Sequence, residues 1–377
     1  LLILFTVSIH NTKIIVWGQS SDYALYLVIL FFLASCSILG MFKIDKKLEY
    51  SLLFISFLAL FLFSGLRYDV GMDYSSYEQL YKDSLFQLNP EIKELGWAYL
   101  FYWCRNIGIS FSIIILLISF FTIYCVFVFI RRYSPYPFLS ILIFFCFAQY
   151  YTYTFNVIRQ CLAIYIFFTL LECICQRKMA KYFISIALTV VFVHSSAIIL
   201  FPLYFLLHRY YSLYVKIVLI VIALFCAKYL IVFMASSESY KIYLAFEQFA
   251  EEITITSYLL ILITSFFIVL ELFIKNRIAE KNVLFNISFL SLLCFTIACF
   301  FAGTPLVIVV LRLAFYFTPV LIVLLPLIVQ DLFRYRSQCI MIFFITVVYT
   351  CLFCYTISTG GEKNKLIPYK TILSKQK

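Results

Sequence analysis

The sequence predicts an all-α fold, a polytopic integral membrane helical bundle with about ten to twelve transmembrane segments. Of its 377 residues, 65% are hydrophobic and only 12% are charged, whereas a soluble domain carries roughly a quarter charged residues. Apolar runs of eighteen or more residues recur along the chain, and each is long enough to cross ~30 Å of hydrocarbon as a helix. These two observations exclude a soluble globular protein.

The apolar runs and the breakers between them define the predicted elements in order. Spans are expected near residues 22–42, 50–66, 109–130, 135–155, 157–175, 214–234, 257–274, 283–302, 305–330 and 339–356. We assign them to one transmembrane domain, 22–356, followed by a polar C-terminal tail at 357–377. The assignment of residues 1–21 stays open, because His10, Asn11 and Lys13 interrupt an apolar run there.

Residues 182–207 resist assignment as one span. They are apolar for 26 residues, yet His194, Ser195 and Ser196 stand in the middle and Pro202 follows. Such a run fits either one long tilted helix or two short helices that meet at the polar triplet. Loop charge favours the second, a broken hairpin whose outer tip carries His194.

Lys and Arg residues decide that choice and the orientation. With the hairpin broken, fifteen of the 29 Lys and Arg fall in six short loops on one side, which we expect to be cytoplasmic. The two larger outer loops, 67–108 and 235–256, hold five basic residues against ten acidic ones. Both chain ends are then outside. The net charge of +11 therefore reflects membrane orientation and not a nucleic-acid-binding surface.

Unusual polar residues gather at the predicted outer face. Arg312 lies within a predicted span, where a charge costs roughly 2.5–3.5 kcal/mol and normally faces a cavity or a partner. The other candidates follow the second span, start the fifth span or occupy the hairpin tip; they are Arg67, Asp73, Tyr74, Glu94, Arg159, Gln160 and His194. Four of them have a structural alternative: a helix tether for Arg312, a stop-transfer charge for Arg67, snorkelling for Arg159 and a satisfied buried ring for His194.

Together these residues point to an anionic substrate. Guanidinium groups form paired hydrogen bonds with phosphate oxygens, and Asp73 or His194 is able to accept a proton from a hydroxyl. The choice between Asp73 and His194 stays open. The set fits transfer chemistry on a phosphorylated lipid, without naming the reaction.

The order of these motifs resembles the EpsG/Wzy-type polysaccharide polymerases of bacteria. The resemblance starts with Gly65-Leu66-Arg67, Val70-Gly71, Asp73-Tyr74 and Tyr77, and continues with Glu94 and Gly96. It then runs through Asn156, Arg159-Gln160 and Ala163, through His194, Ser196-Ala197 and Pro202, and ends with Arg312 and Tyr316. It covers roughly residues 22–330, and the stretch between the hairpin and Arg312 carries no matching motif.

The resemblance implies a glycosyltransferase that joins undecaprenyl-pyrophosphate-linked oligosaccharide repeat units into O-antigen (lipopolysaccharide) or capsular polysaccharide. The reaction would take place at the periplasmic or outer face of the bacterial cytoplasmic (inner) membrane. Asp73, His194 and Arg312 are the expected catalytic residues. Arg67, Tyr74, Glu94, Arg159, Gln160 and Tyr316 are expected to bind substrate. No metal or other cofactor is expected, and a chain-length regulator and a flippase are possible partners alongside membrane lipid.

Three other functions stay open on the sequence. A flippase for the same lipid-linked units also needs a cationic cavity and broken helices, although no internal repeat of hydropathy is visible. An O-antigen ligase or another lipid-dependent glycosyl- or acyltransferase would differ mainly in its acceptor. A purely structural protein would leave Arg312 and His194 unexplained.

Overall fold

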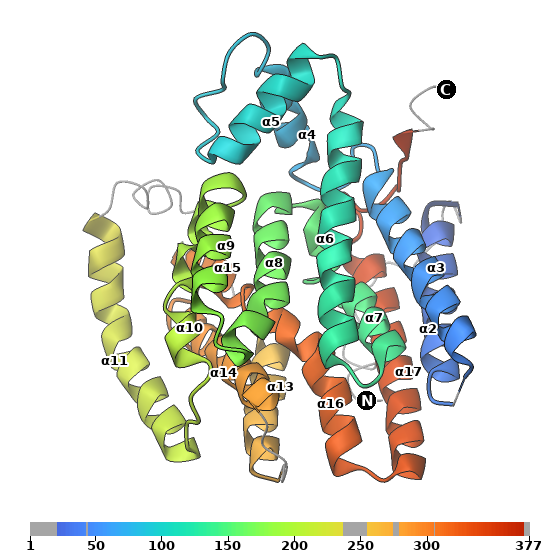
Figure 1. Cartoon of the computed structure of the whole chain (residues 1–377), viewed down its shortest axis with the longest axis vertical. Coiled ribbons are helices and arrows are strands. Elements are labelled where there is room, and N and C mark those ends of the chain that lie inside the picture. Colours follow the sequence, from blue (N-terminus) through green and yellow to red (C-terminus); the bar gives the residue numbers. More distant parts are fainter. Residues whose placement is uncertain (1–20, 43, 237–254, 274–278, 305, 373–377) are drawn as a thin grey trace.

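A computed structural model of the chain describes residues 21–42, 44–236, 255–273, 279–304 and 306–372. Figure 1 shows these residues as a helical bundle whose long helices run roughly along one axis. The α-helices are α2 (Ser21–Leu39), α3 (Lys46–Gly65), α4 (Tyr74–Lys82), α5 (Leu95–Asn106), α6 (Phe111–Tyr133), α7 (Pro137–Cys146), α8 (Ile158–Cys175), α9 (Met179–Phe192), α10 (Leu203–Leu206), α11 (Leu213–Ser236), α13 (Ile255–Leu270), α14 (Ala279–Phe300), α15 (Leu306–Ala314), α16 (Leu321–Leu332) and α17 (Tyr335–Gly360). Short 3₁₀ helices are η1 (Thr152–Phe155), η2 (Ser195–Leu200), η4 (Glu271–Phe273) and η5 (Thr318–Val320). The predicted loop 235–256 and segment 1–21 lie almost entirely outside the described residues.

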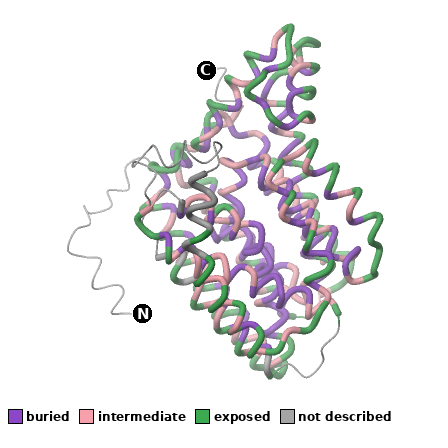
Figure 2. Tube along the Cα trace, turned by 90° about the vertical axis from the view of Figure 1, so that its left-hand side faces the viewer, coloured by how far each residue is buried: buried purple, intermediate pink, exposed green. Residues whose placement is uncertain are grey.

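The outer surface of the bundle is apolar, as a membrane requires. Among the described residues, six helices are long and apolar enough to cross a bilayer, and shorter apolar helices lie between them. Large hydrophobic side chains point outward, for example Phe31 and Phe54 at 61% exposure and Ile340 at 68%. Figure 2 shows buried residues along the centre of the bundle and exposed ones around it. The predicted polytopic helical membrane fold is confirmed.

The continuous span predicted at 135–155 is wrong. α7 ends at Cys146, and the backbone of Phe147 is extended before the short helix η1. Two threonine hydroxyls there donate to nearby carbonyls, Thr152 to Ala148 at 2.7 Å and Thr154 to Tyr151 at 2.6 Å. Such local bonds compete with helical ones. The irregular backbone is tolerated because it is buried inside the protein.

Two other apolar runs contain breaks. The span predicted at 305–330 corresponds to a candidate membrane span, Val307–Leu332, within which α15 and α16 are separated at Phe315–Phe317 and by η5, so Arg312 lies in the last turn of a short helix. The 182–207 run is broken as predicted, because α9 ends at Phe192, His194 is extended and η2 follows. Both breaks free backbone groups near the same end of the bundle.

Charged residues occupy the two ends of the bundle. The turns between α6 and α7 and between α16 and α17 lie at the lower end in Figure 1, whereas α4 and α5 lie at the upper end. The lower end holds ion pairs between helices, Arg132 with Glu172 and Glu280, and Lys281 with Asp331. Arg132 and Lys281, both predicted to be cytoplasmic, therefore lie at the same end of the bundle. The upper end carries the candidate site.

Candidate active site

Glu94 immediately precedes α5 and is packed against the broken hairpin. A Cβ atom at Gly96 would lie 2.1 Å from the carbonyl oxygen of Phe192, so only glycine permits this approach. The indole of Trp97 then donates to the carbonyl of Val193 at 2.7 Å. The start of α5 therefore packs closely against the end of α9, and Glu94 faces His194.

The carboxylate of Glu94 is the centre of a charged cluster. Its Oε2 accepts from Arg159 at 2.6 Å, and its Oε1 lies 3.0 Å from His194 Nδ1. Ser195 adds its backbone N–H and its hydroxyl, both at 3.3 Å. Glu94 is 5% exposed. Because an ionised carboxylate only accepts hydrogen bonds, His194 donates from Nδ1, and Nε2 is then the acceptor nitrogen of the neutral ring.

These contacts determine the pKa of Glu94. Burial alone would raise it, but the hydrogen bonds from His194 and Ser195 and the charge of Arg159 outweigh burial and lower the pKa to about 2. A carboxyl whose pKa is lower in the folded protein stabilises the fold above its unfolded pKa, and this contribution is lost as pH falls through the folded value. Glu94 is therefore ionised at neutral pH.

We expect Glu94→Gln to destabilise the protein at pH 7 by about 1–3 kcal/mol, because it leaves buried donors without their charged acceptor. The difference from wild type should shrink as pH falls from 4.5, the ordinary value, towards about 2. Thermal unfolding in detergent across this range measures it. Glu78→Gln is the matched control, since Glu78 pairs with Lys82 on the surface of α4. A stability difference independent of pH would contradict the assignment.

Asp73 and Arg312 approach this cluster from two further elements. Asp73 occupies the position before the first residue of α4. Burial raises its pKa, while the positive charges of Arg312 and Arg159 act in the opposite direction. Arg312 itself is exposed, and within the described part of the chain no carboxylate forms a direct ion pair with it. Its guanidinium is thus available to an added anion.

Two further side chains hold the broken helices in place. Gln160 donates to the backbone carbonyl of Arg312 at 2.8 Å and so satisfies an end of α15 that the break leaves open. The hydroxyls of Ser196 and Tyr316 lie 2.8 Å apart and join η2 to the break after α15. Gln160 and Tyr316 are buried, so their contacts position Arg312 and His194.

Arg67 and Tyr74 lie apart from the cluster. Arg67 is 1% exposed, and its NH1 donates to the carbonyl of Ser64 and to the hydroxyls of Ser64 and Ser119, while its guanidinium stands 4.7 Å from the Phe155 ring centroid. Tyr74 is also buried, edge-on to Phe111 at 5.4 Å. Both are in contact with protein groups, and their expected part in substrate binding stays a prediction.

Sequence reasoning missed two contributors. Ser195 gives two hydrogen bonds to Glu94 but was noted only as part of a polar break. Ser119 lies in an apolar run and gave no signal, although it contacts the buried Arg67. A buried arginine needs hydrogen-bond acceptors, so a lone serine in a neighbouring span can indicate where such an arginine lies.

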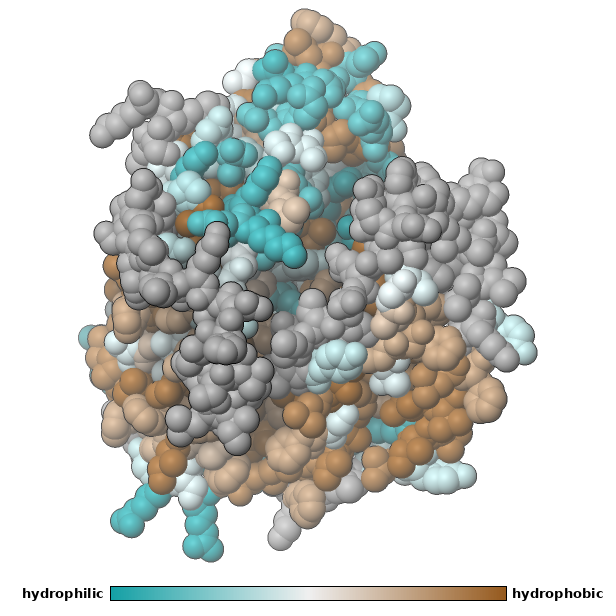
Figure 3. All heavy atoms as spheres, turned by 180° about the vertical axis from the view of Figure 1, so that it is seen from behind, coloured by the Kyte–Doolittle hydropathy of each residue, from teal (hydrophilic) through white to brown (hydrophobic). Residues whose placement is uncertain are grey.

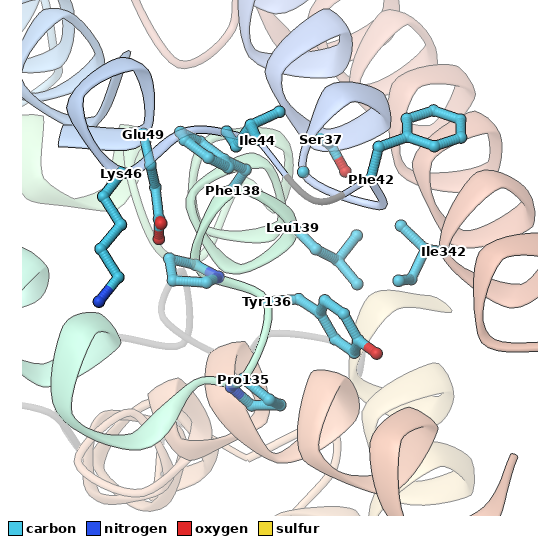
Figure 4. A pocket seen from close by; sticks show the side chains of 12 residues that line it. Ser37, Phe42, Ile44, Lys46, Glu49, Pro135, Tyr136, Phe138, Leu139 and Ile342 are labelled. Atoms are coloured by element: carbon cyan, nitrogen blue, oxygen red, sulfur yellow. The ribbon is translucent and has the colours of Figure 1, made fainter. Parts of the chain in front are cut away.

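A pocket of about 360 Å³ lies at the other end of the bundle (Figure 4). Lys46 and Glu49 contribute charge, while Tyr136, Phe138 and Ile342 are among the residues that make the rest of its wall. None of the candidate residues lines it. We place the site at the charged cluster, because there a buried carboxylate contacts Arg159 and His194 beside the breaks in two helices. Figure 3 shows hydrophilic residues gathered at the upper end, the end of α4 and α5, above a largely hydrophobic surface.

Fold and site together define a multispanning membrane protein with a charged cluster at one end of its bundle. The model of the EpsG family matches residues 50–371, which is most of the chain. The chain therefore belongs to the EpsG family, a Wzy-like polysaccharide polymerase family. No curated protein and no solved structure matches it.

Proposed function

We propose that this protein polymerises undecaprenyl-pyrophosphate-linked oligosaccharide repeat units into a surface polysaccharide, O-antigen or capsule, at the outer face of the bacterial cytoplasmic membrane. Family membership supports a polysaccharide polymerase. The observation that carries the finer proposal is the Glu94–His194 pair beside Arg159, within electrostatic reach of Asp73 and Arg312.

His194 is the proposed general base. In the reaction, an acceptor hydroxyl oxygen on one lipid-linked unit attacks the anomeric carbon of the growing chain. The bond between that carbon and the pyrophosphate oxygen breaks, and undecaprenyl pyrophosphate leaves with the electron pair. The hydroxyl proton passes to His194 Nε2, while Glu94 holds the ring and stabilises the imidazolium that forms.

Arg312 and Arg159 are the proposed stabilisers of the leaving group. Preorganised cations aimed at developing charge lower the barrier most effectively where water is scarce. The first turns of α4, α5 and α8 begin at or beside Asp73, Glu94 and Arg159, and helix N-termini favour anions. Asp73 lies close enough for its charge to interact with those of Arg312 and Arg159. Arg67 is not proposed to bind the pyrophosphate, because it is buried and donates to protein acceptors.

The proposal is tested with purified protein in liposomes, supplied with an undecaprenyl-pyrophosphate-linked repeat unit. We expect oligomers of increasing length and one undecaprenyl pyrophosphate released for each new linkage. A flippase would move units across the bilayer without releasing that lipid. Release that needs a separate lipid acceptor, without oligomers, would indicate a ligase. Either of these results would overturn the proposal.

A further inference from the structure

The end of the chain returns to the candidate site. After α17 ends at Gly360, residues Lys365–Ile372, here called the strap, run beside residues Leu66–Asp73, here called the Arg67 loop. Figure 1 shows this end of the chain beside the upper part of α3. The sequence suggested only a polar tail for this region.

Backbone hydrogen bonds join the strap to the Arg67 loop. The N–H of Ile372 donates to Leu66, that of Tyr68 to Lys370 and that of Gly71 to Lys365, each at 2.9 Å. Arg67 and Thr371 form an antiparallel bridge. The strap therefore satisfies polar groups along a loop that has no regular structure of its own.

Aromatic side chains anchor the strap to the bundle. The ring of Tyr369 stacks on Phe63, with centroids 4.3 Å apart and an interplanar angle of 7°, and its hydroxyl donates to the carbonyl of Phe63. Tyr26 donates to the carbonyl of Leu366 at 2.9 Å. Leu366 and Ile367 are buried. A tail in solvent would leave these groups exposed, so the sequence of the strap favours its packing against the bundle.

The loop beneath the strap contains two residues with positive φ. Asp69 has φ of 52°, which L-residues rarely adopt, and Gly71 has φ of 99°, which glycine adopts readily. On its other side, the N–H of Met72 donates to Asn156 at 2.7 Å. The loop is thus held between the strap and the start of α8, and Asp73 is its last residue.

We propose that the strap is a positioning element of the catalytic machinery, which sets the Arg67 loop so that Asp73 faces Arg159 and Arg312. The effect on polymerisation rests on the proposed function. The effect on the loop does not, so the two are measured separately.

The test compares Tyr369→Ala with Tyr369→Phe and with Tyr355→Ala, in full-length protein at equal membrane abundance. Tyr355 is an exposed tyrosine on α17 and serves as the matched control. Hydrogen exchange of peptides covering residues 66–73 reports on the loop. Oligomer formation from the lipid-linked unit reports on activity.

We expect Tyr369→Ala to speed exchange in the Arg67 loop, to leave α6 and α8 protected, and to lower the polymerisation rate by up to about a hundredfold, the cost of misplacing a reacting group by about 1 Å. Tyr369→Phe keeps the stacked ring, so its hydrogen exchange in the loop and its polymerisation rate should both stay close to wild type. If Tyr369→Ala does not reach the membrane, the double variant Tyr26→Phe/Tyr369→Phe carries the same test with smaller effects.

Unchanged exchange in the loop would overturn the proposal, and so would a loosened loop with wild-type polymerisation. Wild-type protein that makes no polymer would refute the proposed function alone, since the exchange measurement still decides whether the strap fixes the loop.

Discussion

His194→Gln is expected to reduce polymerisation by about 10²–10⁴-fold, the usual contribution of a general base. Glutamine still donates a hydrogen bond to Glu94, so the hairpin should stay closed, but its amide has no basic nitrogen. The rate of undecaprenyl pyrophosphate release by purified protein measures the loss. Membrane abundance and thermal stability should change little.

His208→Gln is the control for the His194 substitution. Its Nδ1 lies 3.1 Å from the carbonyl of Tyr204, four residues earlier, and it contacts none of the cluster residues. Near-normal release by His194→Gln would exclude this residue as the base. If Asp73→Asn then abolished release, Asp73 would take that role.

Arg312→Lys should reduce polymerisation by about 10²–10³-fold, as removal of a single donor from an oxyanion site does. Lysine keeps the positive charge but cannot form the planar two-point contact with pyrophosphate oxygens that a guanidinium forms. Because Gln160 binds the backbone of residue 312, the break after α15 should persist in the variant. The measured quantity is polymer length in cells, compared at equal protein level.

Arg336→Lys at the opposite end of the bundle is the matched control, since Arg336 is exposed and lies at the start of α17. A polymer of wild-type length from Arg312→Lys would show that charge alone suffices, and the two-point contact would be rejected. Loss in both variants would point to a general effect on insertion.

The sequence predicted that most of the candidate residues gather at one face of the bundle. His194 in a helix break, Arg159 at the start of a helix and Arg312 inside an apolar run are unusual in a membrane protein, because each carries a polar cost there. Loop charge then placed them at one face. The structure brings His194 and Arg159 onto Glu94 and places Arg312 near Asp73.

The sequence does not show which side chains form ion pairs and hydrogen bonds with Glu94 and Arg67. Glu94 is one of several acidic residues in an outer loop, and only the close approach of Gly96 to Phe192 shows which cations it meets. Arg67 looked equivalent to Arg159, yet Ser64, Ser119 and Phe155 enclose it. Such pairings depend on tertiary packing between elements far apart in the chain.

The shorter helices and the strap were missed for related reasons. Hydropathy reports how apolar residues 135–155 are, but not that α7 ends at Cys146 and that the short helix η1 follows after an extended residue. The tail looked polar because it carries five lysines, Lys363, Lys365, Lys370, Lys375 and Lys377. Its buried residues, Leu366 and Ile367, are too few for a pattern.

The most direct test of the central claim, that the charged cluster is a polymerisation site, is a gel of surface polysaccharide from a host that lacks the gene. The strain is complemented with wild-type protein or with Arg312→Ala, at equal membrane abundance. We expect a ladder with wild type and single-unit bands in the uncomplemented and Arg312→Ala strains. An unchanged ladder without the gene would contradict the claim, as would loss of even the single-unit band, which would place the protein at export or ligation.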